Sequence, residues 1–189
     1  MGDRLIVEAT PIAGVHIVRS VPHRDARGAF ERVYCEVELA ALLDGRHIVQ
    51  INRSTTSRVG AARGLHFQQS PHAETKLIRC LKGKVYDVAV DLRASSPTLL
   101  SWHGVELSPD NGRMAVIPPG CAHGFQALLA DSELLYLHTA AYSPHSEAGF
   151  ALDDVHFGIA WPLPLDRELF SERDRKLPCV PAGFRGVPV

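Results

Sequence analysis

The sequence predicts an all-β jelly roll in which helix is the minor element, and two observations carry the prediction. Short runs of strand-forming residues recur along the 189-residue chain, separated by clusters of Gly, Pro, Asn, Asp and Ser. One run, residues 84–92, places Tyr86, Val88, Val90 and Leu92 in alternation with Asp87 and Asp91. Because successive strand residues point to opposite faces, this run predicts one apolar and one more polar face.

Taken in order, the first element is a helix over residues 36–43, where Ala and Leu are frequent and Gly45 follows as a stop signal. Lys82-Gly83 predicts a hairpin turn, and Pro-Asp-Asn-Gly at 109–112 predicts a second turn because Asn and Gly accept positive φ. Five prolines after Trp161 predict an extended covering arm over 161–189. The predicted strands span residues 47–51, 76–81, 84–92, 103–107, 113–117 and 133–139.

The bulk numbers favour a single domain over residues 1–189, long enough to bury a substantial core. An apolar fraction of 46% and a charged fraction of 22% are ordinary for a globular protein. The net charge of -1 does not indicate binding to nucleic acid. No apolar run is long enough to span a membrane and the N-terminus lacks a signal peptide's apolar core, so a cytoplasmic location is expected. Reduced thiols are expected at four widely spaced cysteines, Cys35, Cys80, Cys121 and Cys179.

The segment 63–76, Arg-Gly-Leu-His-Phe-Gln-Gln-Ser-Pro-His-Ala-Glu-Thr-Lys, carries the strongest chemical signal. It offers a base, His66, and a cation, Lys76, which opens a predicted strand. A base and a cation on adjacent strands suit proton abstraction next to a carbonyl, because the lysine can hold the enolate charge that the base creates. The segment therefore indicates a class of reaction.

A second motif lies in residues 112–123, where Gly is followed after five residues by Pro-Pro-Gly and after two more by His123. This spacing resembles the second sequence motif of cupins, which are small double-sheet jelly rolls. The Pro-x-Gly turn would end one strand, and His123 would open the next and point into the barrel mouth. Read alone, His123 is equally well a structural histidine that is hydrogen-bonded inside the barrel.

The first cupin motif would supply His-x-His and a later Glu as metal ligands, but here His66 is followed by Gln68, with Glu74 further on. An amide is a poor ligand for zinc, iron or copper. A metal site would need His66, Glu74 and His123 to converge, with Gln68 or His72 completing the set. A site without metal or other cofactor, in which His66 stays basic, is therefore expected.

Taken together, these residues resemble the dTDP-4-dehydrorhamnose 3,5-epimerase family, the metal-free cupin epimerases of sugar nucleotides. The resemblance covers roughly residues 24–178, and many ordered matches carry it. They lie at residues 25–31 (Asp-Ala-Arg-Gly-Ala-Phe-Glu), 50–54 (Gln-Ile-Asn-Arg-Ser), 63–68, 76–79, 85–93, 96–98, 117–125 and 171–174.

The resemblance implies a role for four catalytic residues. His66 matches the base that removes the proton next to the C4 ketone, and Asp174 matches the acidic partner that orients this base. Lys76 matches the cation that stabilises the enolate oxygen, and Tyr136 matches the acid that returns a proton on the opposite face. Without the resemblance, Ser171-x-x-Asp174 would indicate only a helix cap, and Tyr136 would be assigned to the core.

The resemblance also implies a substrate-binding set and a homodimer. Arg27 and Glu31 match an N-terminal segment that crosses to the partner subunit and contacts the nucleotide there, so residues 1–55 are expected to contribute to dimer contacts. Arginine suits a diphosphate through its bidentate fork. The remaining matches to the sugar and diphosphate pocket are Gln50, Asn52, Arg63, His123, Tyr142 and Arg173.

Several positions depart from the family pattern: Leu137 stands for a usual Lys, Ala141 for the first of two Tyr, and Leu152 for a Trp. The expected reaction is epimerisation at C3 and C5 of a dTDP-4-keto-6-deoxyhexose in deoxysugar or polysaccharide biosynthesis. In the family these positions belong to the wall of the substrate pocket. Their changes therefore leave open a C3-only or C5-only epimerase, or a ketoisomerase on a dTDP-, GDP- or CDP-sugar. A metal-dependent cupin and a non-catalytic sugar-nucleotide binder are weaker alternatives, the latter because it would need neither His66 nor Tyr136.

Overall fold

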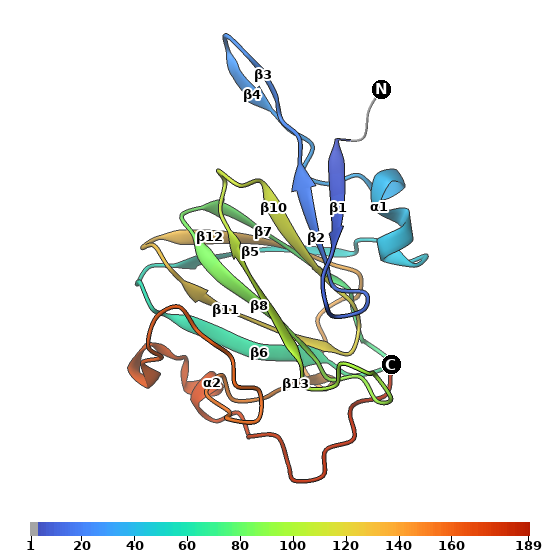
Figure 1. Cartoon of the computed structure of the whole chain (residues 1–189), viewed down its shortest axis with the longest axis vertical. Coiled ribbons are helices and arrows are strands. Elements are labelled where there is room, and N and C mark those ends of the chain that lie inside the picture. Colours follow the sequence, from blue (N-terminus) through green and yellow to red (C-terminus); the bar gives the residue numbers. More distant parts are fainter. Residues whose placement is uncertain (1–3) are drawn as a thin grey trace.

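The computed structural model describes residues 4–189, which form two facing β-sheets with two short α-helices at the periphery (Figure 1). The strands within each sheet pair antiparallel. This architecture is the predicted jelly roll. In sheet order, the first sheet contains β1 (Leu5–Ala9), β2 (His16–Ser20), β10 (Arg113–Ile117), β7 (Lys76–Lys82), β12 (Ser132–His138) and β5 (Gln50–Thr56). The second contains β13 (Glu147–Gly149), β6 (Ala62–Gln68), β11 (Cys121–Ala127), β8 (Val85–Asp91) and β9 (Trp102–Leu107).

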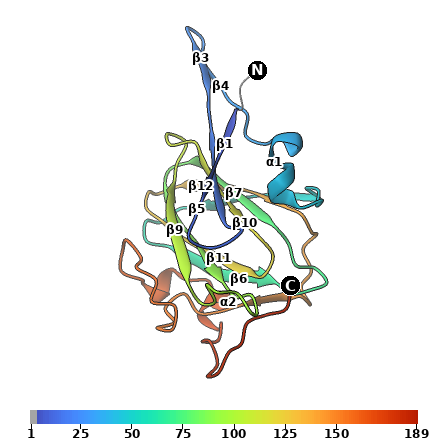
Figure 2. The same ribbon diagram turned by 45° about the vertical axis from the view of Figure 1, so that its right-hand side comes forward.

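A separate hairpin, β3 (His23–Asp25) and β4 (Gly28–Phe30), projects away from both sheets in two views (Figures 1 and 2). Its six strand residues are all exposed. The helix α1 (Glu36–Leu43) follows it and lies beside the first sheet. The C-terminal arm carries the 3₁₀ helix η1 (Arg167–Leu169) and the helix α2 (Glu172–Arg175), and passes beneath the second sheet.

Three apolar layers hold these elements together. The layer between the sheets contains Ile78 and Leu134 from the first sheet and Val85 and Phe125 from the second. The outer face of the first sheet packs against α1 through residues such as Leu39 and Leu43. The outer face of the second sheet is covered by the arm, with Leu65 and Phe67 of β6 packed against Phe170, Val180 and Val187. Apolar burial on both sides of each sheet is the main stabilising contribution.

Most of the predicted elements are confirmed. The helix at 36–43 and the strand at 113–117 have the predicted bounds, and four further strands agree within one residue at each end. The strand predicted at 47–51 is placed wrongly, because β5 runs over Gln50–Thr56, where its polar residues pair with β12 along its full length. The sequence patterns did not predict β1 to β4, β13 or η1. They gave no bounds for three other elements: β6 was indicated only as the strand of His66, β11 as the strand that His123 would open, and α2 by the capping pattern at 171–174.

Two local predictions are wrong. Lys82-Gly83 is not a hairpin turn, because β7 and β8 belong to different sheets and the segment crosses between them. The strand β8 is not half-exposed either: its more polar face points into the barrel. Asp87 there pairs with the buried His123, and Asp91 pairs with the partly buried Arg93, so side-chain partners replace the expected solvent.

Candidate active site

A cavity of about 360 Å³ opens between the two sheets. Side chains from β5, β6, β7, β11, β12 and α2 line it, so residues more than 100 positions apart in the sequence meet there. All four predicted catalytic side chains and five of the predicted binding side chains reach it. The former are His66, Lys76, Tyr136 and Asp174, and the latter are Asn52, Arg63, His123, Tyr142 and Arg173.

His66 and Asp174 form a hydrogen-bonded pair, with Nε2 of the imidazole 2.7 Å from Oδ1 of the carboxylate. Because a carboxylate only accepts, Nε2 carries the proton in the neutral imidazole, and Nδ1 keeps a lone pair. The His66 side chain is 26% exposed whereas that of Asp174 is 4% exposed, so the imidazole is the more accessible member of the pair. The pair is therefore a base held in one tautomer by a buried anion.

The short helix α2 positions Asp174. The Ser171 hydroxyl accepts a hydrogen bond from the Asp174 backbone amide, which is the capping pattern read from the sequence. Burial alone would raise the pKa of Asp174, but the hydrogen bond and charge of His66, with hydrogen bonds from Ser171 and the Gly64 amide, outweigh it and lower the pKa. Asp174 is thus both part of a capped helix and the anion beside His66.

Lys76 begins β7, and its ammonium Nζ donates a hydrogen bond to the His66 carbonyl oxygen at 3.1 Å. Its side chain is 10% exposed and lies 3.5 Å from the carboxylate of Glu74. Burial lowers the pKa of Lys76 below its ordinary value, and Glu74 opposes that effect. The structure therefore places a desolvated cation beside the strand that carries His66.

Tyr136 enters the cavity from β12, on the sheet opposite to His66. Its hydroxyl lies 3.2 Å from the Ser54 hydroxyl, and its ring packs edge-on against His123 and parallel to His138. Burial raises the pKa of Tyr136, with a smaller opposing effect from the Ser54 hydrogen bond. The phenol is therefore a proton donor at neutral pH.

The sequence left open whether His123 is hydrogen-bonded inside the barrel or points into its mouth, and the structure shows both. Its Nε2 lies 2.6 Å from Oδ2 of Asp87, a buried pair within the second sheet, so it is hydrogen-bonded as a structural histidine would be. It also lines the cavity beside Tyr136 and stands opposite His66 in the pairing of β11 with β6. Two His–Asp pairs thus lie side by side at the cavity.

The predicted binding residues gather at the cavity rim. The Tyr142 hydroxyl and the Arg173 guanidinium both donate to the Glu147 carboxylate, at 2.8 and 2.6 Å. Gln50 does not line the cavity, but its side-chain oxygen accepts a hydrogen bond from the Tyr142 backbone amide. Arg63 points its guanidinium toward the carbonyl of Thr55 at 3.1 Å. With Arg53, three arginines therefore line the cavity, and the guanidinium fork matches phosphate oxygens.

Sequence reasoning missed several residues of the site, among them Arg53, Ser54, Asp87, His138 and Glu147. For His138 a signal existed, because it lies two residues after Tyr136 in a predicted strand and so shares its face. Glu147 and Ser54 gave no local signal, since their partners come from other elements.

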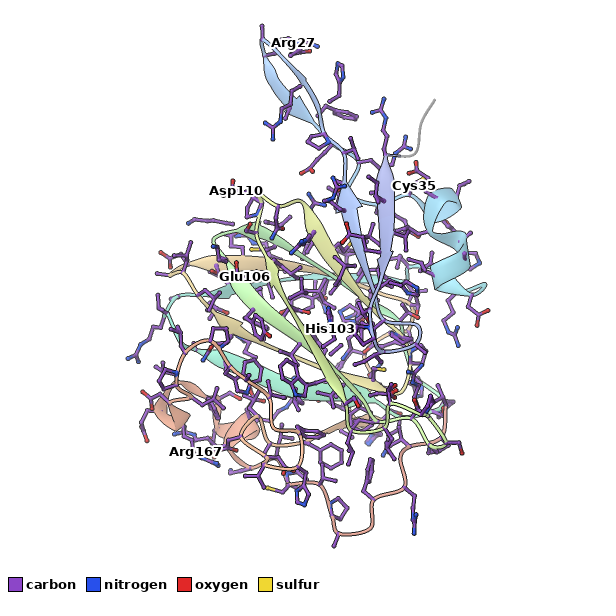
Figure 3. The ribbon with its side chains drawn as sticks, in the orientation of Figure 1. Arg27, Cys35, His103, Glu106, Asp110 and Arg167 are labelled. Carbon is purple, nitrogen blue, oxygen red and sulfur yellow. The ribbon has the colours of Figure 1, made fainter. Side chains whose placement is uncertain are left out.

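Arg27 and Glu31 do not reach this cavity within the same chain. Figure 3 shows Arg27 at the tip of the projecting hairpin, where it pairs with Asp25. Glu31 lies after the hairpin and pairs with the buried Arg79 at 2.7 Å. Neither residue can therefore contact a ligand in this chain's cavity from its described position.

The described residues 4–189 contain no cluster of three His, Cys, Asp or Glu side chains arranged to hold a metal ion. The candidate ligands face different partners: His66 faces Asp174, His123 faces Asp87, and Glu74 faces His138. Gln68 donates to two backbone carbonyl oxygens. All four cysteines are free, and two of them, Cys80 and Cys121, are buried.

Comparison with known proteins gives a consistent picture. Residues 9–181 match the family model of dTDP-4-dehydrorhamnose 3,5-epimerase. The chain is 38% identical to the dTDP-4-dehydrorhamnose 3,5-epimerase of Sinorhizobium fredii over 190 residues, covering 99% of this chain and 97% of that protein.

Two solved structures extend the comparison. The Legionella pneumophila dTDP-6-deoxy-D-glucose-3,5-epimerase in complex with dTDP-4-keto-L-rhamnose is 35% identical, with a TM-score of 0.87 and 97% of each chain covered. ChmJ, a 3'-monoepimerase from Streptomyces bikiniensis in complex with dTDP-quinovose, is 30% identical, with a TM-score of 0.82 and coverage of 90% of this chain and 85% of that one.

Proposed function

The chain belongs to the dTDP-4-dehydrorhamnose 3,5-epimerase family, and from this premise we propose how its side chains carry out the reaction. The protein is an isomerase with the dTDP-4-dehydrorhamnose 3,5-epimerase activity of deoxysugar biosynthesis, and it binds dTDP-sugars. The substrate in this proposal is a dTDP-4-keto-6-deoxyhexose whose C4 ketone acidifies the neighbouring C–H bonds. The observation that carries the assignment is the meeting of His66, Lys76 and Tyr136 in one cavity.

His66 removes the proton from the carbon next to the ketone. Its Nδ1 takes the proton because Nε2 is engaged by Asp174, and the buried carboxylate stabilises the imidazolium that results. The electron pair of the broken C–H bond moves to the C4 oxygen and gives an enolate. Lys76 stabilises that oxygen as negative charge develops, which is where a preorganised cation contributes most.

Tyr136 then returns a proton to the same carbon from the other side. It stands on the sheet opposite to β6, so a sugar held between the sheets presents one face to His66 and the other to the phenol. Removal on one face and return on the other inverts the carbon. Water restores the protonation states of both side chains before the second carbon reacts.

The substrate-binding residues of this proposal are those of the cavity and its rim. Arg63 and Arg173 contact the diphosphate, because guanidinium forks match phosphate oxygens. Asn52, His123 and Tyr142 contact the sugar from the cavity wall, and Gln50 supports Tyr142 through its backbone amide.

We further infer a homodimer in which the N-terminal segment, about residues 1–55, contributes dimer contacts and the hairpin β3–β4 crosses to the partner's site. Residues 1–3 of this segment lie outside the described part of the chain. Arg27, with a side chain 90% exposed, and Phe30, 68% exposed, project on a hairpin that joins neither of the two large sheets. An exposed cation and an aromatic ring suit contacts with a nucleotide; Glu31 lies at the base of the same segment.

The remaining expectations stand as part of the same proposal: one domain over residues 1–189, with the arm at 161–189 as its cover, acting in the cytoplasm. No helix within residues 4–189 is long and apolar enough to span a membrane.

Incubation with dTDP-4-keto-6-deoxyglucose in deuterium oxide tests the function. Deuterium at both C3 and C5, with inversion at both, is the expected result. Deuterium at C3 alone would identify the enzyme as a 3-epimerase, as ChmJ is described. The departures from the family pattern at Leu137, Ala141 and Leu152 would then be the first candidates for the cause of the changed specificity. The absence of label from a folded sample that binds dTDP would contradict an epimerase acting on this substrate.

A further inference from the structure

The proposed mechanism requires Lys76 to be protonated, but the lysine is buried. Its ammonium is needed as a cation at the enolate oxygen, yet its side chain is only 10% exposed, and burial disfavours the charged form. Its hydrogen bond to the backbone goes to a neutral carbonyl, that of His66. A nearby anion is therefore required for Lys76 to remain protonated.

Glu74 supplies that anion, and His138 holds it in place. One Glu74 oxygen, Oε1, lies 3.5 Å from the Lys76 ammonium, and the other, Oε2, lies 2.8 Å from Nδ1 of His138. The Glu74 side chain is 6% exposed and that of His138 is 13% exposed. All three side chains line the cavity, and His138 stands directly opposite Lys76 where β12 pairs with β7.

The hydrogen bonds define the histidine's tautomer. The Glu74 carboxylate only accepts, so Nδ1 of His138 carries a proton. In the neutral ring Nε2 then keeps a lone pair, and the Asn52 amide nitrogen lies 3.5 Å from it. The Tyr136 ring stacks on the imidazole with an interplanar angle of 16°. His138 is thus fixed from three sides with its donor aimed at Glu74.

From these contacts we propose that Glu74, held by His138, is the counter-ion that keeps Lys76 protonated for enolate stabilisation. Both are positioning residues, because neither needs to touch the substrate. The inference rests on the proposed function, since it gives Lys76 the enolate role.

Two other charged side chains face Lys76, and they act in opposite directions on its pKa. Glu147 on β13 favours its protonation more weakly than Glu74 does, and Arg173 on α2 opposes it. These two side chains are themselves ion-paired at 2.6 Å. His138 on β12 adds positive charge only when its ring is protonated. Glu74 is therefore the anion that most favours the charged form of Lys76.

The substitution Glu74→Gln tests the proposal, because the amide keeps the shape and removes the charge. The measurement is the pH profile of kcat/KM for epimerisation. Without Glu74, Lys76 loses its proton at lower pH, so the basic limb of the profile moves down by about one unit, the scale of an opposite charge within hydrogen-bonding range. The acidic limb should stay in place, because Glu74→Gln leaves the His66–Asp174 pair unchanged.

Glu106→Gln is the matched control. Glu106 lies 3.5 Å from Lys84, the same separation as in the Glu74–Lys76 pair, but both side chains are largely exposed and lie outside the cavity. Its profile should coincide with that of the unchanged enzyme. A basic limb that also stays in place in Glu74→Gln would overturn the counter-ion proposal while leaving the epimerase assignment intact.

His138 is tested by a pair of substitutions. His138→Phe keeps a ring against Tyr136 and removes the donor to Glu74, so kcat should fall severalfold with little change in KM. His138→Asn presents an amide donor near the position of Nδ1 and should recover most of the loss. Equal activity in the two variants would show that the ring only fills space. A sample in which the unchanged enzyme shows no epimerisation would instead contradict the proposed function.

Discussion

At the scale of single residues, the proposed mechanism depends on two proton carriers with different properties. His66 is partly exposed and keeps Nδ1 free, so it can exchange its proton with solvent. Tyr136 is half-buried, and its desolvation raises the pKa of the phenol, so it stays protonated at neutral pH and donates only to a strongly basic carbon. In the proposed mechanism, the enolate next to Lys76 is such a base. Because His66 and Tyr136 lie on opposite sheets, proton removal and proton return are separated in space.

Tyr136→Phe should separate proton removal from inversion. His66 can still form the enolate, but no acid remains on the opposite sheet, so the proton returns from the His66 side. We expect deuterium to enter the substrate from solvent with retained configuration while epimerisation falls by about 10²-fold or more. NMR of the recovered substrate measures label and configuration together. Inversion at an undiminished rate would show that another group is the acid.

At the scale of elements, the four-residue helix α2 is joined to β6 by Asp174, the residue proposed to orient the catalytic base. Ser171 caps the helix and Asp174 bonds His66, so helix position and base orientation are coupled. The low pKa of Asp174 means that the unfolded chain takes up its proton at a higher pH than the folded protein does. This stabilisation is therefore complete above about pH 3.9 and is lost as the pH falls through the folded pKa.

Asp174→Asn should remove that acid-dependent contribution and lower kcat as well. Below about pH 4, the free energy of unfolding should fall less steeply with pH in the variant than in the unchanged protein. Urea titrations at a series of pH values measure it. At neutral pH, kcat should drop by about 10²-fold or more because the imidazole loses its orienting anion. Identical slopes in the two proteins would mean that Asp174 does not carry the shift.

Gly64 sets the distance between β6 and β11, the strands that carry His66 and His123. Its φ is 118°, and an added Cβ would lie 2.6 Å from the Gly124 Cα and 2.7 Å from the His123 carbonyl oxygen. Gly64→Ala should lower the free energy of unfolding by more than about 1 kcal/mol, because backbone atoms cannot move aside easily.

Gly28→Ala is the matched control for Gly64→Ala. Gly28 has a comparable φ of 133°, but a Cβ added there would meet no atom of the described residues within 4 Å. It shares the backbone strain without the clash, so chemical denaturation should show a clearly smaller loss of stability. Equal losses in the two variants would attribute the effect to φ alone.

Sequence reasoning predicted elements with a clear local pattern and failed where the pattern depends on distant partners. Residues 36–43 have helix formers and a stop signal, and 113–117 is bounded by turn residues, so both were found. The strand β6 contains proposed catalytic, glycine and apolar residues and shows no alternation of polar and apolar residues. One of its faces lines the cavity and the other packs against the arm. The inward direction of Asp87 could not be read either, since it depends on His123 from another strand.

The site was predictable to a similar extent. His66 and Lys76 stand in one segment and suggested their chemistry directly. Asp174 lies 108 residues from His66 in the sequence. Only the family resemblance predicts it as the partner of His66, because no local pattern distinguishes it from a residue of a helix cap. The Glu74–His138 pair joins a loop to β12, and pairing across strands is a property of the fold.

At the scale of the whole molecule, the projecting hairpin predicts shared active sites. A homodimer with twofold symmetry would place each Arg27 at the other subunit's cavity. Arg27→Ala and His66→Ala should each impair the enzyme alone. In a mixed dimer, the site with intact His66 receives the hairpin with intact Arg27, so one site per dimer regains activity.

Differently tagged subunits allow the mixed dimer to be isolated before its activity is measured. The homodimers of each variant are the controls. A mixed dimer no more active than their average would show that the hairpin serves its own subunit or none.

The central claim is that His66 is the base, and deuterium exchange in His66→Ala tests it most directly. With dTDP-4-keto-6-deoxyglucose in deuterium oxide, the variant should incorporate no label at C3 or C5, while its affinity for dTDP, measured by calorimetry, stays close to that of the unchanged enzyme. Retained dTDP binding shows that the cavity is still formed. Substantial exchange at either carbon in the variant would contradict the account and assign the base to another residue.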